Sequence, residues 1–562
     1  PYQSKPTIAV YDGTGPVPGQ PFPGELVNVI DIDPNDGRYS ICAPGGVDDG
    51  TDCGSDQDVN GTPDDFNGDG IADAGRFDNN FQPSPGADFF GYIDPDGEGF
   101  NTSGDFAFDD SGIADTWGVN IRIEYEKDSG IFLTSITDFK DYVKLLFIDV
   151  DSAPVNQAVN YAGVDATSFT QEFRINGETD RMRWVAGLYY LNIDTDSDNG
   201  LKFPPNSLGQ NPDLGGPFDL GVDAQLETDS YSIFAQTEYD LTDQLTLVTG
   251  LRIMQEEKDY TFVQSLYTAP TNAREIHQGF QITIGPTYPG GVPTPFTDST
   301  SDTLFAGKLQ LDYRPSDGLL IYGGINRGVK AGSFNAQLAG GLPVPTSAIP
   351  YDKEVLTSYE GGFKKTFSDG RTRFNGTMYY YDYKDYQAFL FTGVSGVVVN
   401  NDADNIGVEF DLQSSPMDGL DFLLAVSWFN ATVKDVPLRV GGPIIRDVKP
   451  VYAPEFQAAG LIRYEWPALN GMLNVQADVT YSDEYFYNLR NFDADKYDSY
   501  TKVGASIGWT SNEDRWGISL YIRNLTDERI GIQGFDLATL CGCNEISFQP
   551  PRWYGLNVKY SF

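Results

Sequence analysis

One stretch of the chain, residues 56–73, carries oxygen side chains at a spacing that suits a hard cation. It reads DQDVNGTPDDFNGDGIAD and divides after Asp64 into two copies of D-x-[DN]-x-[DN]-G-x-x-D. Oxygen ligands at alternate positions, followed by a glycine for a sharp turn, are how a loop wraps Ca²⁺. The ligands predicted from the two copies are Asp56, Asp58, Asn60, Asp64, Asp65, Asn67, Asp69 and Asp73.

The spacing resembles the calcium loops of thrombospondin type 3 and dockerin repeats. It departs from an EF-hand, because no glutamate stands at position 12 of the loop. The alternative interpretation is a solvated acidic loop of Asp-Gly turns. We expect a structural Ca²⁺ role, in which the ion neutralises carboxylates that repel one another so that a long loop can order.

The chain has four cysteines. Cys42 and Cys53 flank part of the acidic segment, and Cys541 and Cys543 lie in the last predicted long loop. They indicate an oxidising, extracellular setting, and four cysteines allow three connectivities. Cys42–Cys53 is the simplest pairing. A bridge within Cys541-Gly-Cys543 would be strained, so crosslinks between the two segments stay open.

Catalytic motifs are missing from the sequence. The chain has one histidine, His277, which we predict to be a surface residue in a Pro/Gly-rich loop. Neither an HExxH nor a GxSxG motif is present, and no Cys/His spacing indicates zinc. We therefore predict that the protein is not an enzyme.

The charge balance excludes nucleic acid as a partner. Lysine plus arginine total 37 against 81 aspartate plus glutamate, a net charge of −44. Phosphate binding needs clustered positive charge. Residues 1–116 alone hold 23 acidic and 3 basic residues, so this segment is predicted as one long acidic loop.

From residue 117 onward the sequence alternates apolar and polar residues in short runs, which predicts strands. Seventeen strands are expected, including 168–175, 182–192, 231–241 and 244–254. Turns on one side are short, such as PSDG and PMDG, whereas connections on the other side run to about 17–46 residues. Aromatic runs such as Tyr189–Tyr190 and Tyr379–Tyr381 mark the strand ends.

Alternating strands, short turns on one rim, long loops on the other and aromatic girdles are typical of an outer-membrane barrel. We therefore predict an all-β fold, a transmembrane antiparallel β-barrel over residues 117–562. Such barrels have even strand numbers, and plugged transporters have 22 strands. On that basis a plug and five strands would precede the seventeen in this chain.

Several local sequences resemble the barrel of TonB-dependent receptors. They include FTQEFRINGETDRMRWVAGLYYL, YDLTDQLTLVTGLR, YRPSDGLLIYGGINRGVKAGSFN, LTSYEGGFKKTF and YIRNLTDERI, with a last strand that ends at Phe562. The resemblance implies a 22-stranded barrel with an N-terminal plug that takes up scarce nutrients with energy delivered by TonB. The chain holds neither plug nor TonB box, so TonB contact would lie in a missing N-terminal region.

The resemblance implies a Gram-negative outer membrane, with long loops extracellular, the C-terminus periplasmic, and outer-membrane lipid and lipopolysaccharide as neighbours. A small nutrient of the siderophore, vitamin or oligosaccharide class would be the ligand. Arg252, Arg327 and Lys330, expected near the extracellular ends of their strands, are candidates for substrate contact or for pairing with plug or loop carboxylates. Alternative functions are a passive porin and a calcium-stabilised surface adhesion or assembly protein.

Overall fold

The computed structural model describes residues 112–149, 158–203, 218–268, 276–277, 279–283, 295–336, 346–367, 370–391, 396–438, 445–492, 495–537 and 543–562, together with short strands at 2–6, 9–11, 26–28, 31–32 and 39–40. Within these residues no helix is long and apolar enough to cross a membrane. The described chain is almost entirely antiparallel strand, and one sheet of nineteen strands forms a closed barrel. The predicted all-β barrel is therefore confirmed.

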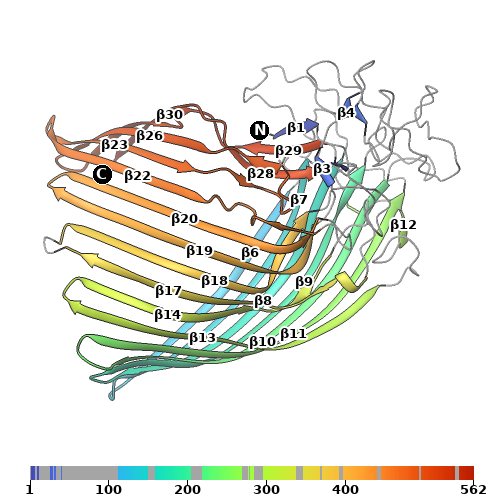
Figure 1. Cartoon of the computed structure of the whole chain (residues 1–562), viewed down its shortest axis with the longest axis horizontal. Coiled ribbons are helices and arrows are strands. Elements are labelled where there is room, and N and C mark those ends of the chain that lie inside the picture. The colour runs from blue at the N-terminus through green and yellow to red at the C-terminus, as the bar shows by residue number, and fades with distance from the viewer. Residues whose placement is uncertain are drawn as a thin grey trace.

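Seventeen of the nineteen barrel strands are long and two are short. The long strands are β6 (Ile113–Lys127), β7 (Ile131–Asp149), β8 (Val159–Glu178), β9 (Met182–Phe203), β10 (Phe218–Asp240), β11 (Leu245–Thr268), β13 (Phe296–Ser316), β14 (Leu319–Lys330), β17 (Glu354–Thr366), β18 (Thr372–Phe391), β19 (Gly396–Met417), β20 (Leu420–Pro437), β22 (Phe456–Ala468), β23 (Gly471–Ser482), β26 (Tyr500–Ser511), β27 (Trp516–Arg523) and β30 (Trp553–Tyr560). The short ones, β12 (Phe280–Thr283) and β21 (Ile445–Val448), add to the edges of β11 and β20. Figure 1 shows the long strands side by side around the barrel.

The remaining elements lie outside the barrel sheet. They are β1 (Tyr2–Pro6), β2 (Ala9–Tyr11), β3 (Leu26–Asn28), β4 (Asp31–Ile32), β5 (Tyr39–Ser40), β15 (Ser333–Phe334), η3 (Thr346–Ala348), β16 (Pro350–Tyr351), β24 (Tyr485–Phe486), β25 (Lys496–Tyr497), β28 (Gly531–Leu537) and β29 (Cys543–Phe548). β1, β29 and β28 form a three-stranded sheet. This sheet joins the first residues of the chain to the connection that precedes the last strand.

The hairpin turns lie where the sequence places them. β13 and β14 are joined at the PSDG segment, and β19 and β20 at PMDG. Gly318 and Gly419 have φ of +73° and +81°, a backbone conformation that favours glycine. A Cβ at Gly419 would lie 2.0 Å from the carbonyl oxygen of Glu465, so a larger residue is also excluded by contact. We call this end of the barrel the short-turn rim and the opposite end the long-loop rim.

The strands run further toward the long-loop rim than the apolar alternation predicts. β10 begins at Phe218 and β8 begins at Val159, about ten residues before the predicted strand starts at 231 and 168. As a result some predicted long loops are short: only residues 392–395 separate β18 from β19. The extensions were not predicted because their outward residues are polar, whereas the prediction relied on an apolar face.

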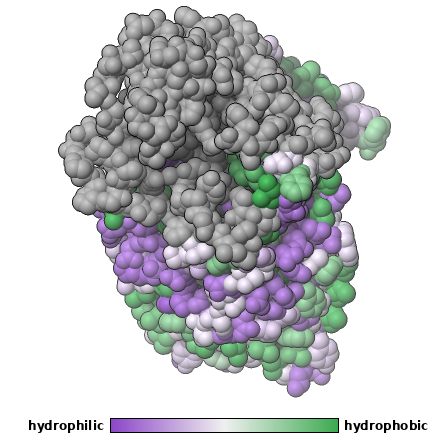
Figure 2. Space-filling model, turned by 90° about the vertical axis from the view of Figure 1, so that its right-hand side faces the viewer, coloured by the Kyte–Doolittle hydropathy of each residue, from purple (hydrophilic) through white to green (hydrophobic). Residues whose placement is uncertain are grey.

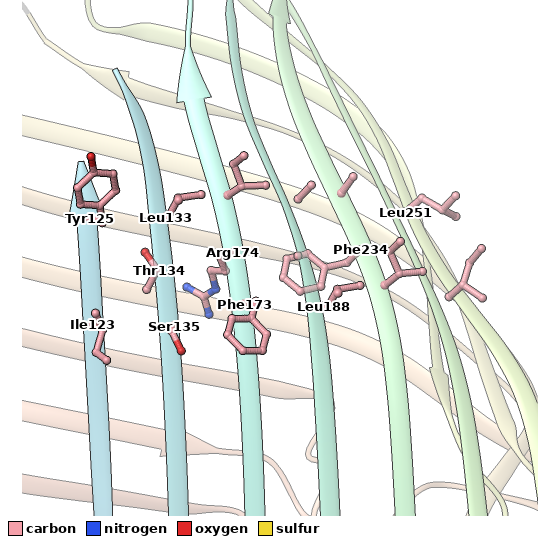
Figure 3. Close-up of a pocket in the computed structure, with 16 residues that line it drawn as sticks. Ile123, Tyr125, Leu133, Thr134, Ser135, Phe173, Arg174, Leu188, Phe234 and Leu251 are labelled. Carbon is pink, nitrogen blue, oxygen red and sulfur yellow. The ribbon is translucent and has the colours of Figure 1, made fainter. Parts of the chain in front are cut away.

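One face of the barrel is apolar at mid-height. Large hydrophobic side chains at every second position are exposed, as at Ile233 on β10 and Leu251 and Ile253 on β11. Together with Phe173 and Leu188, they line a groove that crosses strands β6 to β11 (Figure 3). In a closed barrel, exposed apolar residues at a period of two identify the face that meets lipid. Polar surface predominates closer to the long-loop rim (Figure 2).

Tyrosines bound this apolar face, but only alternate members of each predicted aromatic run belong to it. Tyr190 packs outward against Tyr231 with ring centroids 4.9 Å apart, and Tyr359 and Tyr380 form a similar cross-strand pair. Tyr189, the neighbour of Tyr190, points into the barrel, because successive side chains of a strand lie on opposite faces.

The junction between β30 and β6 differs from the others. Elsewhere each pair of neighbouring long strands is joined by a ladder of paired residues, as between β27 and β30 and between β6 and β7. β30 and β6 follow one another in the barrel order, but no ladder joins them among the described residues, and all fifteen residues of β6 and seven of the eight in β30 are exposed. Each of these two strands therefore has one edge without a ladder partner in the part of the chain that the structure describes.

Candidate functional site

The inner wall of the barrel is polar and lined by ion pairs within single strands. Asp138 pairs with Lys140 at 3.4 Å, and Arg314 pairs with Asp312 at 3.2 Å. Partners two residues apart lie on the same face of a strand, so each pair forms without help from a neighbouring strand. A wall of this kind suits a hydrated lumen rather than an apolar ligand cavity.

Arg252 lies on this inner wall but far from the long-loop rim. It is the eighth residue of β11, opposite Phe234, and level with the outward apolar Leu251 and Ile253. Its guanidinium lies over the rings of Tyr189 and Phe234, with 5.3 and 5.8 Å to the ring centroids. Its Nε is buried without a hydrogen-bond partner among the described residues. The expectation that Arg252 lies near a strand end is wrong, because β11 continues to Thr268.

Arg327 is near the long-loop end of β14, as expected, but on the outer face. Its guanidinium lies 3.9 Å from the ring centroid of Phe305 and donates a hydrogen bond to the carbonyl oxygen of Phe305. Phe305 is one of the exposed apolar residues of the outer face. Arg327 therefore holds its charge at the edge of the lipid-facing band, where long basic side chains commonly lie.

Lys330 is the last residue of β14 and is exposed. It pairs in register with Glu354, the first residue of β17. The structure thus places the three predicted basic residues in three different surroundings: the inner wall, the outer face and the rim. They do not form one binding site.

The segment between β14 and β17 is fastened over the long-loop rim by a buried asparagine. Asn335 is 5% exposed, and its Nδ2 donates to the carbonyl oxygens of Ala348 and Val398 at 2.9 and 3.0 Å. Its Oδ1 accepts a hydrogen bond from the Val398 N–H at 2.8 Å. Phe334 beside it stacks on Tyr260 with ring centroids 4.7 Å apart.

Replacement of Asn335 by leucine should loosen this segment. The change leaves three backbone groups without a partner in a buried place, and each such group costs about 1–3 kcal/mol. We expect faster amide hydrogen exchange in residues 331–336 and 346–353, measured by mass spectrometry. Asn375→Leu, which removes one exposed hydrogen bond to Asp411, should leave exchange there unchanged. Equal exchange in both variants would contradict the role given to Asn335.

The predicted calcium ligands at 56–73 and the side chains of the four cysteines lie outside the described residues. Backbone pairing places Pro6 of β1 opposite Cys543 of β29. Ca²⁺ binding and the cysteine pairing both stay predictions.

Sequence reasoning missed one group of chemically active residues. Asp198, Asp223 and His277 come together near the long-loop rim, although they lie far apart in the sequence. The prediction that His277 is a surface residue is wrong, because only 22% of its side chain is exposed. The only signal in the sequence was the alternation of aspartates in DTDSD (194–198), which places three carboxylates on one face of a strand.

Comparison with solved structures gives the same barrel. The ferric yersiniabactin uptake receptor FyuA from Yersinia pestis matches with a TM-score of 0.63 and 17% identity over 80% of this chain and 61% of that one. The siderophore receptor PiuA from Acinetobacter baumannii matches at 0.58 and 16%, over 80% and 64% of the two chains. The ferric-catecholate import receptor Fiu from K12 E. coli matches at 0.56 and 15%, over 85% and 67%.

At such low identities, these matches show a shared fold alone. The chain spans less than two thirds of the length of the first two receptors. The evidence for the family comes from the sequence. Residues 54–525 match the family described as TonB dependent receptor-like, beta-barrel, which covers most of the chain. The chain therefore belongs to the TonB-dependent receptor family, of which it holds the β-barrel.

Proposed function

We propose that the protein takes up a scarce nutrient across the outer membrane of a Gram-negative bacterium with energy supplied through TonB. The observation that carries the proposal is the family's barrel, with an apolar band on its outer face and a polar inner wall. The named neighbours are a ferric yersiniabactin uptake receptor, a siderophore receptor and a ferric-catecholate import receptor, which supports transport as the role of this fold. TonB would be contacted by a region outside this sequence.

The orientation follows from the same proposal. The long-loop rim would face the cell exterior, and the short-turn rim and Phe562 the periplasm. The outer face would lie against lipid and, beyond the tyrosines, lipopolysaccharide. Asp-rich residues 56–73, with Ca²⁺ bound, would order the acidic segment on the outside of the cell.

Charge narrows the ligand class. The net charge is −44, and residues 1–116 hold 23 acidic against 3 basic residues. A field of this sign disfavours the approach of strongly anionic chelates. We infer a neutral or cationic small nutrient of the siderophore or vitamin class, or an oligosaccharide that calcium bridges to the acidic loops. Arg252 on the inner wall would meet either this ligand or a carboxylate of a plug.

Uptake by the full-length protein in a receptor-deficient Gram-negative host tests the proposal. Labelled siderophores, cobalamin and oligosaccharides of differing charge would be supplied to cells with and without TonB, and with and without a proton uncoupler. We expect accumulation of one neutral or cationic ligand that falls to the empty-host level without TonB or the proton gradient. Accumulation that survives both treatments would identify a passive porin instead.

A calcium-dependent adhesion role predicts a different pattern in the same cells. Chelation of Ca²⁺ would then abolish cell–cell contact and leave uptake unchanged. Tight binding of a strongly anionic siderophore to the purified protein would contradict the ligand class inferred from charge.

A further inference from the structure

Two aspartates face each other across neighbouring strands on the outer face of the barrel. Asp198 of β9 and Asp223 of β10 are direct partners in the ladder. Counting along the same strands by twos leads from this pair to Tyr190 and Tyr231, which pack together on the outer face. The aspartates therefore point away from the lumen, on the long-loop side of the tyrosines.

His277 reaches this pair from the connection between β11 and β12. Its Nδ1 lies 3.5 Å from Oδ1 of Asp223. The ring stacks on Tyr267 with centroids 4.8 Å apart and meets the edge of Tyr161 at 5.8 Å. A Cβ at Gly221 would lie 3.0 Å from Nε2 of His277, so only glycine there leaves room for the imidazole. The histidine is thus held in place by packing on several sides.

The imidazole of His277 is not satisfied by the two aspartates beside it. A hydrogen bond between nitrogen and oxygen is normally 2.7–3.2 Å long, and the 3.5 Å between His277 and Asp223 is longer. Nε2 of His277 is buried without a hydrogen-bond partner among the described residues. Like charges directly opposite on two strands are destabilising.

A metal ion could bind one atom from each of the three side chains. One imidazole nitrogen and one oxygen from each carboxylate lie within 4.8 Å of one another. Ligands at roughly 2.0–2.2 Å around a tetrahedral ion are separated by about 3.3–3.6 Å, close to the distance between His277 and Asp223. A nitrogen with two carboxylate oxygens suits Zn²⁺ and similar ions, whereas Ca²⁺ takes oxygen ligands only.

We propose that Asp198, Asp223 and His277 bind a divalent cation of the Zn²⁺ type, which fastens the β11–β12 connection to the outer face of the β9–β10 hairpin. The site is outside the lumen, so it is separate from the nutrient path, and it uses none of the residues predicted to bind calcium at 56–73. Further carboxylates on the same outer face, Glu227 among them, raise the local concentration of cations.

Modification of the histidine by diethyl pyrocarbonate provides a direct test on the full-length protein in detergent. The protein is purified without a histidine tag, stripped with chelator and titrated with ZnCl₂, and the peptide that contains His277 is followed by mass spectrometry. We expect Zn²⁺ to protect His277 saturably. The Asp198→Asn/Asp223→Asn variant should weaken the apparent Zn²⁺ affinity by at least roughly 10–100-fold, the range known for weaker perturbations of metal sites.

Glu227→Gln is the matched control, because it removes one negative charge from the same outer face of β10 and leaves the three ligands intact. In this variant Zn²⁺ should protect His277 as strongly as it does in the unchanged protein. Each sample is first shown to be folded by its heat-modifiable electrophoretic mobility. The proposal would be overturned if Zn²⁺ protected His277 as strongly in the folded double variant as in the control. It would also be overturned if Ca²⁺ protected His277 in the unchanged protein to the same extent as Zn²⁺. The visible absorption of Co²⁺ bound in place of Zn²⁺ would show whether the metal ligands are nitrogen and oxygen. It would be recorded on a variant in which all four cysteines are replaced by serine.

Discussion

Replacement of Leu251 by arginine is expected to lower the free energy of unfolding of the barrel in a bilayer by about 2–4 kcal/mol. Leu251 is 52% exposed on the outer face of β11. It lies midway between Leu247 and Gln255, which are the ladder partners of the outward tyrosines Tyr239 and Tyr231. An arginine at this height cannot reach either interface without distorting the bilayer, whereas Arg327 already lies near the edge of the band.

Reversible urea unfolding in lipid vesicles, followed by tryptophan fluorescence, would measure this effect. Gln236→Arg is the matched control, because Gln236 pairs with Gly250 on the adjacent strand and faces the lumen. Its replacement should change the folding free energy by no more than about 0.5 kcal/mol. If both variants lose equal stability, the assignment of the two faces of β10 and β11 is wrong.

The second large effect is expected at a buried ion pair above the lipid-facing band. Lys202 of β9 and Asp219 of β10 are ladder partners, with side chains 4% and 1% exposed, and they form a salt bridge. Lys202→Met would leave the carboxylate of Asp219 buried without this charge. We expect the free energy of unfolding to fall by about 3–5 kcal/mol in the same urea assay.

Replacement of both partners should lower the free energy of unfolding far less than replacement of Lys202 alone. Burial raises the pKa of Asp219 to about 6 even though Lys202 opposes the shift, so desolvation outweighs attraction in this pair. Lys202→Met/Asp219→Leu, which places an apolar pair beside the buried Val159, the ladder partner of Lys202 on β8, should be about as stable as the unchanged protein. A double variant as unstable as Lys202→Met would contradict this account.

The pH dependence of the same pair gives an independent check. The carboxyl of Asp219 takes up its proton near pH 6 in the folded protein and near pH 4 in the unfolded chain. Between these values the folded state binds more protons, so acidification from pH 6 to pH 4 stabilises it. Relative to Asp219→Asn, the free energy of unfolding of the unchanged protein should therefore rise as the pH falls from 6 to 4. This added stability should be lost as the pH rises again.

The lipid-facing half of the barrel could be predicted from the sequence. Lipid on one side and water on the other impose a period of two, and turns such as PSDG and PMDG require glycine at positive φ. Strand positions around Tyr190, Leu251 and Ile325 follow from these two local rules. The family resemblance rested on the same segments, and the match over residues 54–525 confirms it.

The strand extensions toward the long-loop rim were not predictable in this way. Beyond the tyrosines both faces of a strand meet water or polar loops, so the apolar alternation ends while backbone pairing continues. β11 therefore runs to Thr268, which leaves Arg252 at mid-height instead of at a rim. Its residue type makes Arg252 a candidate for substrate contact, but its depth in the barrel depends on where the strand stops.

The fold class, the family and the faces of the membrane-level strands can be predicted without a structure, because each follows from residues close together in the chain. Tertiary structure alone decided that Asp198, Asp223 and His277 meet, and that Arg252, Arg327 and Lys330 do not. Cross-strand register and the path of a connecting segment set these distances. Both depend on hydrogen bonds and packing between residues that are distant in sequence, so no local pattern records them.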